Sequence, residues 1–256
     1  MIKYAVLTSG SCGNSYAFYD GKSCILVDAG LTLTGLKRRL EQVDIPFDAL
    51  TDVLVTHMHP DHSKGMGVLY RAKGVCIHAS RQCFESDERL FAKLGLKEDM
   101  ISVFSFGDEL FAGAFHAVPF RTSHDSAGSA GYFIENGDSR FFLMTDTGIY
   151  SQESLEMAKA SRVVFLESNY DDDMLESGRY PFVLKRRISG ERGHLSNRQA
   201  RDFLFQIGAG DKTVFLVHLS DNNNTVDAVL ENYTDDFEIK NFTVCERGRT
   251  YGGFYG

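Results

Sequence analysis

The chain has 256 residues, of which 43% are hydrophobic and 12% aromatic, so it can bury a large core. Its formal net charge of −8 argues against a broad nucleic-acid-binding surface. Apolar runs are strand-length, which excludes a membrane span, and the first residues lack the features of a secretory signal. The five cysteines are odd in number and form no Cys-x-x-Cys pair, which indicates reduced thiols and a cytoplasmic protein.

Strand-like and helical patterns alternate along the chain without a linker or an internal repeat. The first half predicts strands near 2–7, 15–19, 24–28, 52–56 and 75–79, and helices near 33–42, 64–73 and 80–94. The second half predicts strands near 101–104, 115–120, 130–136, 140–145, 162–166 and 213–217, and helices near 151–160 and 196–207. This order favours the α/β class, and we interpret it as an αββα sandwich of two mixed β-sheets in one domain, residues 1–256. Cys24 and Cys76 lie in strand-like apolar runs, where we expect buried thiols.

Residues 57–62 carry the densest group of metal-ligand side chains, in the pattern His-x-His-x-Asp-His after the apolar run 53–55. A strand presents alternate side chains on one face, so His57 and His59 should point the same way as the strand ends. Asp61 and His62 follow where the chain must turn. A histidine-rich surface turn is the alternative, but three of the eight histidines within six residues favour a metal site.

Three further candidates end apolar strands: His124, Asp146 and His218. Singly, each is equally well explained as a helix cap or a turn residue. Because the same placement recurs three times, we expect them to complete the metal site. The predicted ligands are therefore His57, His59 and His124 for one cation, Asp61, His62 and His218 for a second, and Asp146 as the bridge between them.

The order and spacing of these residues resemble those of the metallo-β-lactamase superfamily. The first motif of that superfamily is an Asp that closes an early strand, and Asp28 stands at the end of 25–28. The resemblance implies that Asp28 holds the ligand loop by hydrogen bonds, although a turn former before Gly30 is a compatible reading. The ligand pattern is specific for the fold and weakly specific for the substrate.

Other segments narrow the resemblance. The loop 8–15 is rich in Gly, Ser and Asn and can turn N–H groups toward an anion, or simply form a hairpin turn. Glu-Ser-Asn begins at residue 167, and Gly-His-Leu-Ser spans 193–196, where Ser196 suits a helix N-cap. Together with the metal motif, these segments resemble the YycJ (VicX, WalJ) family of bacterial metallo-β-lactamase-fold hydrolases, from residue 4 to about 224. Tyr170 departs from the family pattern, which has His there.

The resemblance implies a dinuclear metal-dependent phosphodiesterase, a 5′-exonuclease on DNA with RNA as a second substrate, in which a metal-bridging hydroxide attacks the phosphate. Asp61 would orient that hydroxide, and His194 would protonate the leaving group or clamp the phosphate. Zinc, manganese or iron suits the ligands. The substrate-binding residues it implies are Ser9, Ser11, Asn14, Asn169 and Ser196. Only 72 positions separate Asp146 from His218, which leaves no room for the β-CASP insertion of ribonuclease J.

Residues 179–201 hold seven Arg and Lys residues against one Glu, a local charge of +6. Tyr180 and Phe182 lie in the same segment and can stack on bases. We interpret this basic segment as a phosphate-binding rim, with a solvated helical face as the alternative. Two other functions remain open: hydrolysis of a small ester, thioester or lactam, and a non-catalytic protein that the metal only stabilises.

Overall fold

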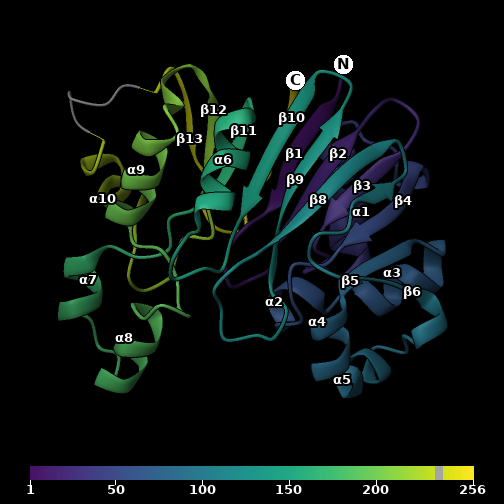
Figure 1. Cartoon of the computed structure of the whole chain (residues 1–256), viewed down its shortest axis with the longest axis horizontal. Helices are drawn as coiled ribbons and strands as arrows, with labels where there is room; N and C mark the ends of the chain where they lie inside the picture. The colour runs from purple at the N-terminus through teal and green to yellow at the C-terminus, as the bar shows by residue number, and fades with distance from the viewer. Residues whose placement is uncertain (234–238) are drawn as a thin grey trace.

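The computed structural model describes residues 1–233 and 239–256. Two seven-stranded sheets face each other, and helices cover their outer faces (Figure 1). This arrangement confirms the predicted αββα sandwich. Within the described ranges, no helix combines the length and the apolar character that crossing a bilayer requires.

The first sheet has the strand order β14-β1-β2-β3-β4-β5-β6. Its strands are β1 Lys3–Thr8, β2 Ser15–Tyr19, β3 Cys24–Val27, β4 Leu50–Leu54, β5 Cys76–Ser80, β6 Ile101–Phe104 and β14 Tyr251–Tyr255. Neighbouring strands from β3 to β6 are parallel, so the connections between them must cross over, which they do through helices. These helices are α1 Leu33–Gln42, α2 Pro60–Ser63, α3 Met66–Lys73, α4 Arg81–Ser86 and α5 Glu88–Lys93.

The second sheet has the order β13-β12-β11-β10-β9-β8-β7. Its strands are β7 Leu110–Ala112, β8 Phe115–Arg121, β9 Ala130–Asn136, β10 Ser139–Met144, β11 Val163–Glu167, β12 Thr213–Val217 and β13 Asn241–Val244. Strands β10 to β13 run parallel. The helices of this half are α6 Gln152–Ala160, α7 Asp172–Ser177, α8 Phe182–Ile188, α9 Asn197–Gln206 and α10 Val226–Glu231. Figure 1 shows α7 and α8 at the lower left, beyond the ends of the strands.

Aromatic side chains fill the space between the sheets. Tyr4 and Phe18 from the first sheet pack edge-on against Phe141, with ring centroids 5.2 and 5.0 Å apart. Central strands also contribute to an outer core: on β3, Ile25 packs between the sheets and Leu26 packs under the helices, and Phe141 and Phe142 alternate in the same way on β10. Burying one such side chain stabilises the fold by about 1.5–3 kcal/mol. Both sheets are therefore covered on two faces, as expected from their apolar strands.

The structure differs from the sequence prediction in several elements. The predicted helix 80–94 is two helices, because the backbone leaves helical geometry at Asp87 (φ −114°, ψ 19°). The prediction did not include β7, β13, β14, α7, α8 or α10. β14 contains the pair Gly252-Gly253, which weakens a strand pattern, and it forms because β1 offers an edge to pair with. The prediction for Cys76 was wrong: its thiol is exposed, because it opens β5 at the rim of the sheet.

Candidate metal centre

The site is built where strands end and the backbone turns sharply. Asp28 directly follows β3, His218 directly follows β12, and Asp146 is the second residue after the end of β10. All three adopt left-handed backbone angles, with φ of 62° at Asp28, 55° at Asp146 and 59° at His218. Asp and His tolerate this region better than most residues, although it costs of order 1–3 kcal/mol each. The turns bring side chains from both sheets to one edge of the sandwich.

Backbone hydrogen bonds fasten the metal motif to two neighbouring loops. The Asn14 N–H donates to the Asp61 carbonyl (2.7 Å), and the Ala29 N–H donates to the His62 carbonyl (2.9 Å). The chains approach so closely that a Cβ at Gly30 would lie 1.8 Å from the Asp61 carbonyl oxygen. A glycine at position 30 is therefore required for the motif to keep its place.

We expect Gly30→Ala to displace the metal motif and to destabilise the protein by about 1–3 kcal/mol, the usual effect of overpacking. Metal affinity should fall with it. Chemical denaturation and metal titration of the purified variant measure both effects. The matched control is Gly35→Ala in α1, where the new Cβ would meet nothing closer than the Thr32 hydroxyl at 3.1 Å. A Gly30 variant as stable as the control would contradict the close packing.

The first predicted ligand group is assembled: His57, His59 and His124 bring one ring nitrogen each within 4.8 Å of the others. The His59 Nδ1 lies 3.3 Å from the His124 Nε2, while the His124 Nδ1 faces the Gly193 carbonyl at 3.1 Å. The His57 Nε2 is buried without a hydrogen-bond partner among the described residues. Burial, with the neighbouring imidazoles, lowers the pKa of His57 well below its ordinary value and keeps it neutral, as a ligand must be.

The second predicted group, Asp61, His62 and His218, is equally close. Asp28 positions His62, because its carboxylate lies 2.7 Å from the His62 Nδ1 and accepts from the N–H and the hydroxyl of Thr56. The His62 Nε2 is thereby directed toward Asp61, 3.4 Å away. This arrangement fits the supporting role that the resemblance implied for Asp28.

Asp146 lies between the two groups. One carboxylate oxygen is 3.3 Å from the His62 Nε2, and the other is 3.7 Å from the His124 Nε2. Its Oδ2 is buried and, like the His218 Nε2, has no hydrogen-bond partner in residues 1–233 and 239–256. Buried acceptors without partners, in a set of imidazoles and carboxylates, are compatible with divalent metal binding.

Glu167 belongs to the site and was missing from the predicted residues. It ends β11, is fully buried, and places its Oε1 2.8 Å from the His218 Nδ1 and 2.7 Å from the His194 Nδ1. Burial would raise the pKa of this carboxyl, but the charge and hydrogen bond of His194 and the hydrogen bond of His218 lower it below its ordinary range. The signal was present, because Glu167 ends an apolar strand just as Asp146 and His218 follow one.

His194 stands beside both groups and lines the cleft, with 20% of its side chain exposed. Its Nδ1 faces Glu167, which leaves Nε2 for another partner. Burial alone would lower the pKa of His194, but the Glu167 carboxylate and then Asp146 raise it above its ordinary value. The ring is therefore disposed to carry a proton on the nitrogen that Glu167 does not occupy.

The predicted substrate-binding residues divide into two sets. Ser11 and Asn169 line the cleft, although Asn169 is itself buried and its amide donates to the His218 carbonyl (2.8 Å). Ser9, Asn14 and Ser196 are buried and bonded within the protein: the Ser9 hydroxyl accepts from the His218 N–H (2.7 Å), and the Ser196 hydroxyl caps α9. Tyr170, at the position where the resemblance expects His, is also buried and bridges to Ser196.

The ligand groups open onto a cleft of ≈ 440 Å³. Helix α8 and the segment before it form one wall of the cleft, with the side chains of Tyr180, Leu184 and Arg187. Asn222 also lines the cleft. The Arg187 Nε donates to Asp125 at 2.5 Å, and that carboxylate lies 3.4 Å from the His124 Nε2. A guanidinium is thus fixed next to the first ligand group.

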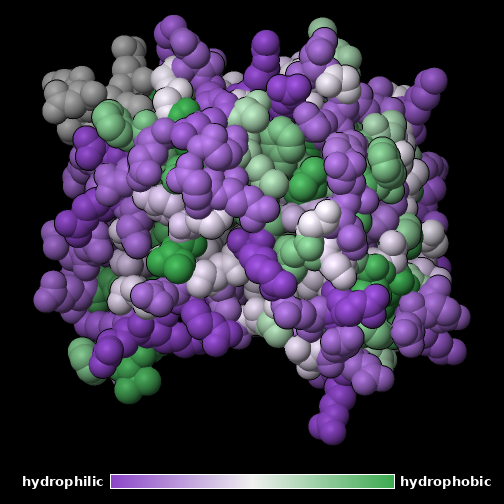
Figure 2. All heavy atoms as spheres, viewed as in Figure 1, coloured by the Kyte–Doolittle hydropathy of each residue, from purple (hydrophilic) through white to green (hydrophobic). Residues whose placement is uncertain are grey.

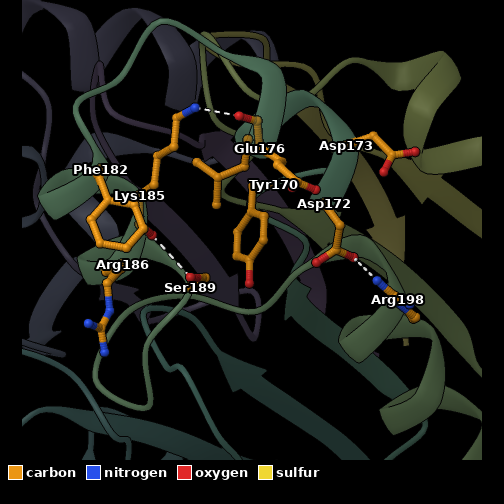
Figure 3. A pocket seen from close by; sticks show the side chains of 10 residues that line it. Tyr170, Asp172, Asp173, Glu176, Phe182, Lys185, Arg186, Ser189 and Arg198 are labelled. Atoms are coloured by element: carbon orange, nitrogen blue, oxygen red, sulfur yellow. Dashed lines mark hydrogen bonds and ion pairs between the residues drawn. The ribbon is translucent and has the colours of Figure 1, made fainter.

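Elsewhere in the basic segment, the positive charge is partly offset by the acidic residues that precede it. Including the four carboxylates of 171–176, the net charge of residues 171–201 is only +2. Figure 3 shows a second pocket, of ≈ 540 Å³, in which Arg198 pairs with Asp172 (2.9 Å) and Lys185 bonds to the Glu176 carbonyl. Two arginines of the segment contact the surroundings of the first ligand group: Arg187 pairs with Asp125, and the Arg192 Nε donates to the His124 carbonyl (3.1 Å).

Helix α8 also exposes two large apolar side chains. Phe182 is 71% and Val183 79% exposed. The hydrophobic group at the lower left of Figure 2 lies where Figure 1 draws α8. Figure 3 shows Phe182 at the edge of the second pocket, with Arg186 below it, and the guanidinium lies 5.8 Å from the ring centre.

Two facing mixed sheets with histidine and aspartate groups at one edge define a class of α/β proteins suited to bind divalent metal. A model described as a beta-lactamase superfamily domain matches residues 24–219. The exodeoxyribonuclease YycJ of Bacillus anthracis is 32% identical over 96% of this chain and 92% of its own length. The exodeoxyribonuclease WalJ of Streptococcus pneumoniae is 32% identical over 87% of this chain and 83% of its own.

The chain therefore belongs to the beta-lactamase superfamily and, within it, to the family of YycJ and WalJ. Among solved structures, the metallo-β-lactamase fold protein YhfI of Bacillus subtilis superposes with a TM-score of 0.74 at 19% identity, covering 98% of this chain and 99% of its own. The fold predicted from the spacing of the ligands is confirmed by this likeness.

Proposed function

We propose that the protein is a dinuclear metal-dependent phosphodiesterase that removes nucleotides from the 5′ end of DNA. The observation that carries the proposal is the convergence of two ligand groups on one cleft with Asp146 between them. The relatives named exodeoxyribonuclease supply the substrate class. RNA is the second candidate substrate.

Two cations fit the residues present. The first would be held by His57, His59 and His124, the second by Asp61, His62 and His218, with one oxygen of Asp146 toward each. When bound, such ions polarise a phosphoryl oxygen and lower the pKa of water. Nitrogen and oxygen ligands suit zinc or manganese, and also iron.

Three side chains act directly on the substrate. Asp61 stays ionised, because the neighbouring His218 and His62 rings lower its pKa against the opposing effect of burial. Its carboxylate can therefore accept a hydrogen bond from the attacking water or hydroxide and orient it. His194 donates a proton from Nε2 to the leaving 3′ oxygen of the released nucleotide, while Glu167 holds the other ring nitrogen. Arg187 pairs with a phosphate at the cleft wall.

Substrate length follows from the cleft. Ser11 offers a hydroxyl near the metal groups, and Tyr180, whose hydroxyl accepts from the Asn222 amide (2.8 Å), offers an aromatic face at the rim. A cleft of ≈ 440 Å³ matches one or two nucleotides better than a duplex. We therefore expect a frayed or single-stranded end to enter.

The test uses metal-loaded protein and single- and double-stranded DNA and RNA labelled at the 5′ or the 3′ end. We expect 5′-labelled DNA to release label as mononucleotide at once, while 3′-labelled DNA shortens in single steps. Cuts in the interior, or release from the 3′ end first, would contradict the polarity. Turnover of a thioester or a lactam without any cleavage of DNA or RNA would replace the proposal by the small-molecule alternative.

A further inference from the structure

A second cluster of metal-ligand side chains lies on the first sheet, away from the cleft. Cys76 and His78 are two residues apart on β5, so they share one face of the sheet, and Asp52 pairs in register with Cys76 from β4. A carboxylate oxygen, a sulfur and a ring nitrogen of these three residues all lie within 4.8 Å of one another. Cys76 opens its strand, whereas His57 and His59 of the candidate metal centre follow the carboxyl end of β4.

The cluster is partly buried and incompletely bonded. The His78 Nε2 lies 2.7 Å from the Asp52 Oδ1, and the two side chains are only 7% and 9% exposed. The His78 Nδ1 is buried and has no hydrogen-bond partner in the part of the chain that the structure describes. Removing one partner of such a buried pair is costly, because it leaves an uncompensated charge. The Cys76 thiol is exposed beside it.

The geometry points to a third cation site, formed by Asp52, Cys76 and His78, that takes Zn²⁺. Sulfur, nitrogen and oxygen donors from three side chains, with a fourth position open to water on the exposed Cys76 side, are a ligand set that zinc accepts. The thiolate makes the set unsuitable for Mg²⁺ or Ca²⁺, which require oxygen ligands.

Charge balance supports the assignment. Burial would lower the pKa of His78, but the Asp52 carboxylate beside it raises that pKa to about 9, so without a cation the protonated ring faces Asp52. Zn²⁺ would displace one proton from His78 and one from Cys76, and two positive charges would then face one thiolate and one carboxylate. The net charge of the half-buried cluster stays zero in both states, so the cation enters with the release of two protons. The bound cation would tie β4 to β5, and β4 leads directly into the metal motif.

The test exploits the thiolate, because no cysteine belongs to the ligand groups at the cleft. Wild-type protein titrated with Co²⁺ should develop a near-ultraviolet sulfur-to-cobalt charge-transfer band. The band should vanish in Cys76→Ser, with bound cobalt falling by one ion per chain. It should persist in Cys12→Ser, the matched control, since Cys12 is also exposed. Absence of the band in the wild type, its survival in Cys76→Ser, or its loss in the control would each overturn the proposal.

Alkylation provides an independent reading of the wild-type protein. Zn²⁺ should slow maleimide modification of Cys76 at least about tenfold and leave Cys12 unaffected, as peptide mass mapping would measure, because a thiolate bound to the cation is a poor nucleophile. Asp52→Asn keeps a hydrogen-bonding side chain but removes one charge, so Zn²⁺ should protect Cys76 less in that variant. Equal modification of Cys76 with and without Zn²⁺ would also overturn the site. Neither reading depends on nuclease activity.

Discussion

Asp146→Asn is expected to leave less than about a tenth of wild-type turnover and also to lower bound metal, a loss of both properties that we do not expect of His194→Ala. The carboxylate reaches toward both ligand groups, 3.3 Å from the His62 Nε2 and 3.7 Å from the His124 Nε2. An amide has one acceptor oxygen instead of two and no charge, so it serves one group at most. Asn tolerates the left-handed backbone at this position, so the loss of activity should come from the changed side chain and not from a strained backbone.

Elemental analysis and turnover on labelled DNA measure both effects. Asp44→Asn is the matched control, because Asp44 has a similar left-handed φ of 52° but is exposed and lies outside the cleft. The control should keep its metal and its activity. An Asp146→Asn protein with full metal content and more than about a tenth of the wild-type rate would refute the bridging role.

His194→Ala should retain its metal and lose about 10²–10⁴-fold in rate on DNA, the usual consequence of removing an acid or a charge-stabilising donor. The loss should be smaller on a nitrophenyl phosphodiester, whose leaving group needs no proton. The comparison of substrates separates proton donation from phosphate binding, since a residue that only binds phosphate would affect both equally.

The control for that experiment is His116→Ala, a half-buried histidine on β8 that also faces a glutamate, Glu135 at 3.3 Å. Its removal should change neither rate. Loss of metal from the His194 variant would instead make His194 a ligand, which the cluster of Asp146, Glu167, His194 and His218 leaves geometrically open.

Sequence reasoning located the candidate site because its residues follow a local rule. Most of the predicted ligands follow an apolar strand within a few residues, such as His57 after β4, Asp146 after β10 and His218 after β12. Parallel strands bring their carboxyl ends to one edge. The same rule, applied to 163–167, would have included Glu167. The rule could not show which polar side chains form their hydrogen bonds within the protein. Ser9 and Asn14 look like exposed loop residues in the sequence, but the folded backbone buries them.

The same reasoning could predict neither the edge strands nor the distribution of charge in space. β14 exists because β1 has an unpaired edge, a property of the assembled sheet that the sequence Tyr-Gly-Gly-Phe-Tyr does not carry. The local charge of +6 covers residues 179–201 only. In the structure, the carboxylates of α7 lie against that segment, as the ion pair between Arg198 and Asp172 shows. Net charge along a chain is therefore a poor guide to charge in space.

The left-handed turns at Asp28, Asp146 and His218 restrict how the site can vary. A substitution at these positions must supply a suitable side chain and must also tolerate the left-handed backbone. Glutamate at position 146 would conserve the charge yet would suit the backbone poorly, whereas asparagine would suit the backbone and lose the charge. Few single changes satisfy both demands, so a new ligand set is more accessible at His57 or His59, where no such backbone constraint applies. The metal preference of this scaffold should thus be easiest to redesign from the first ligand group.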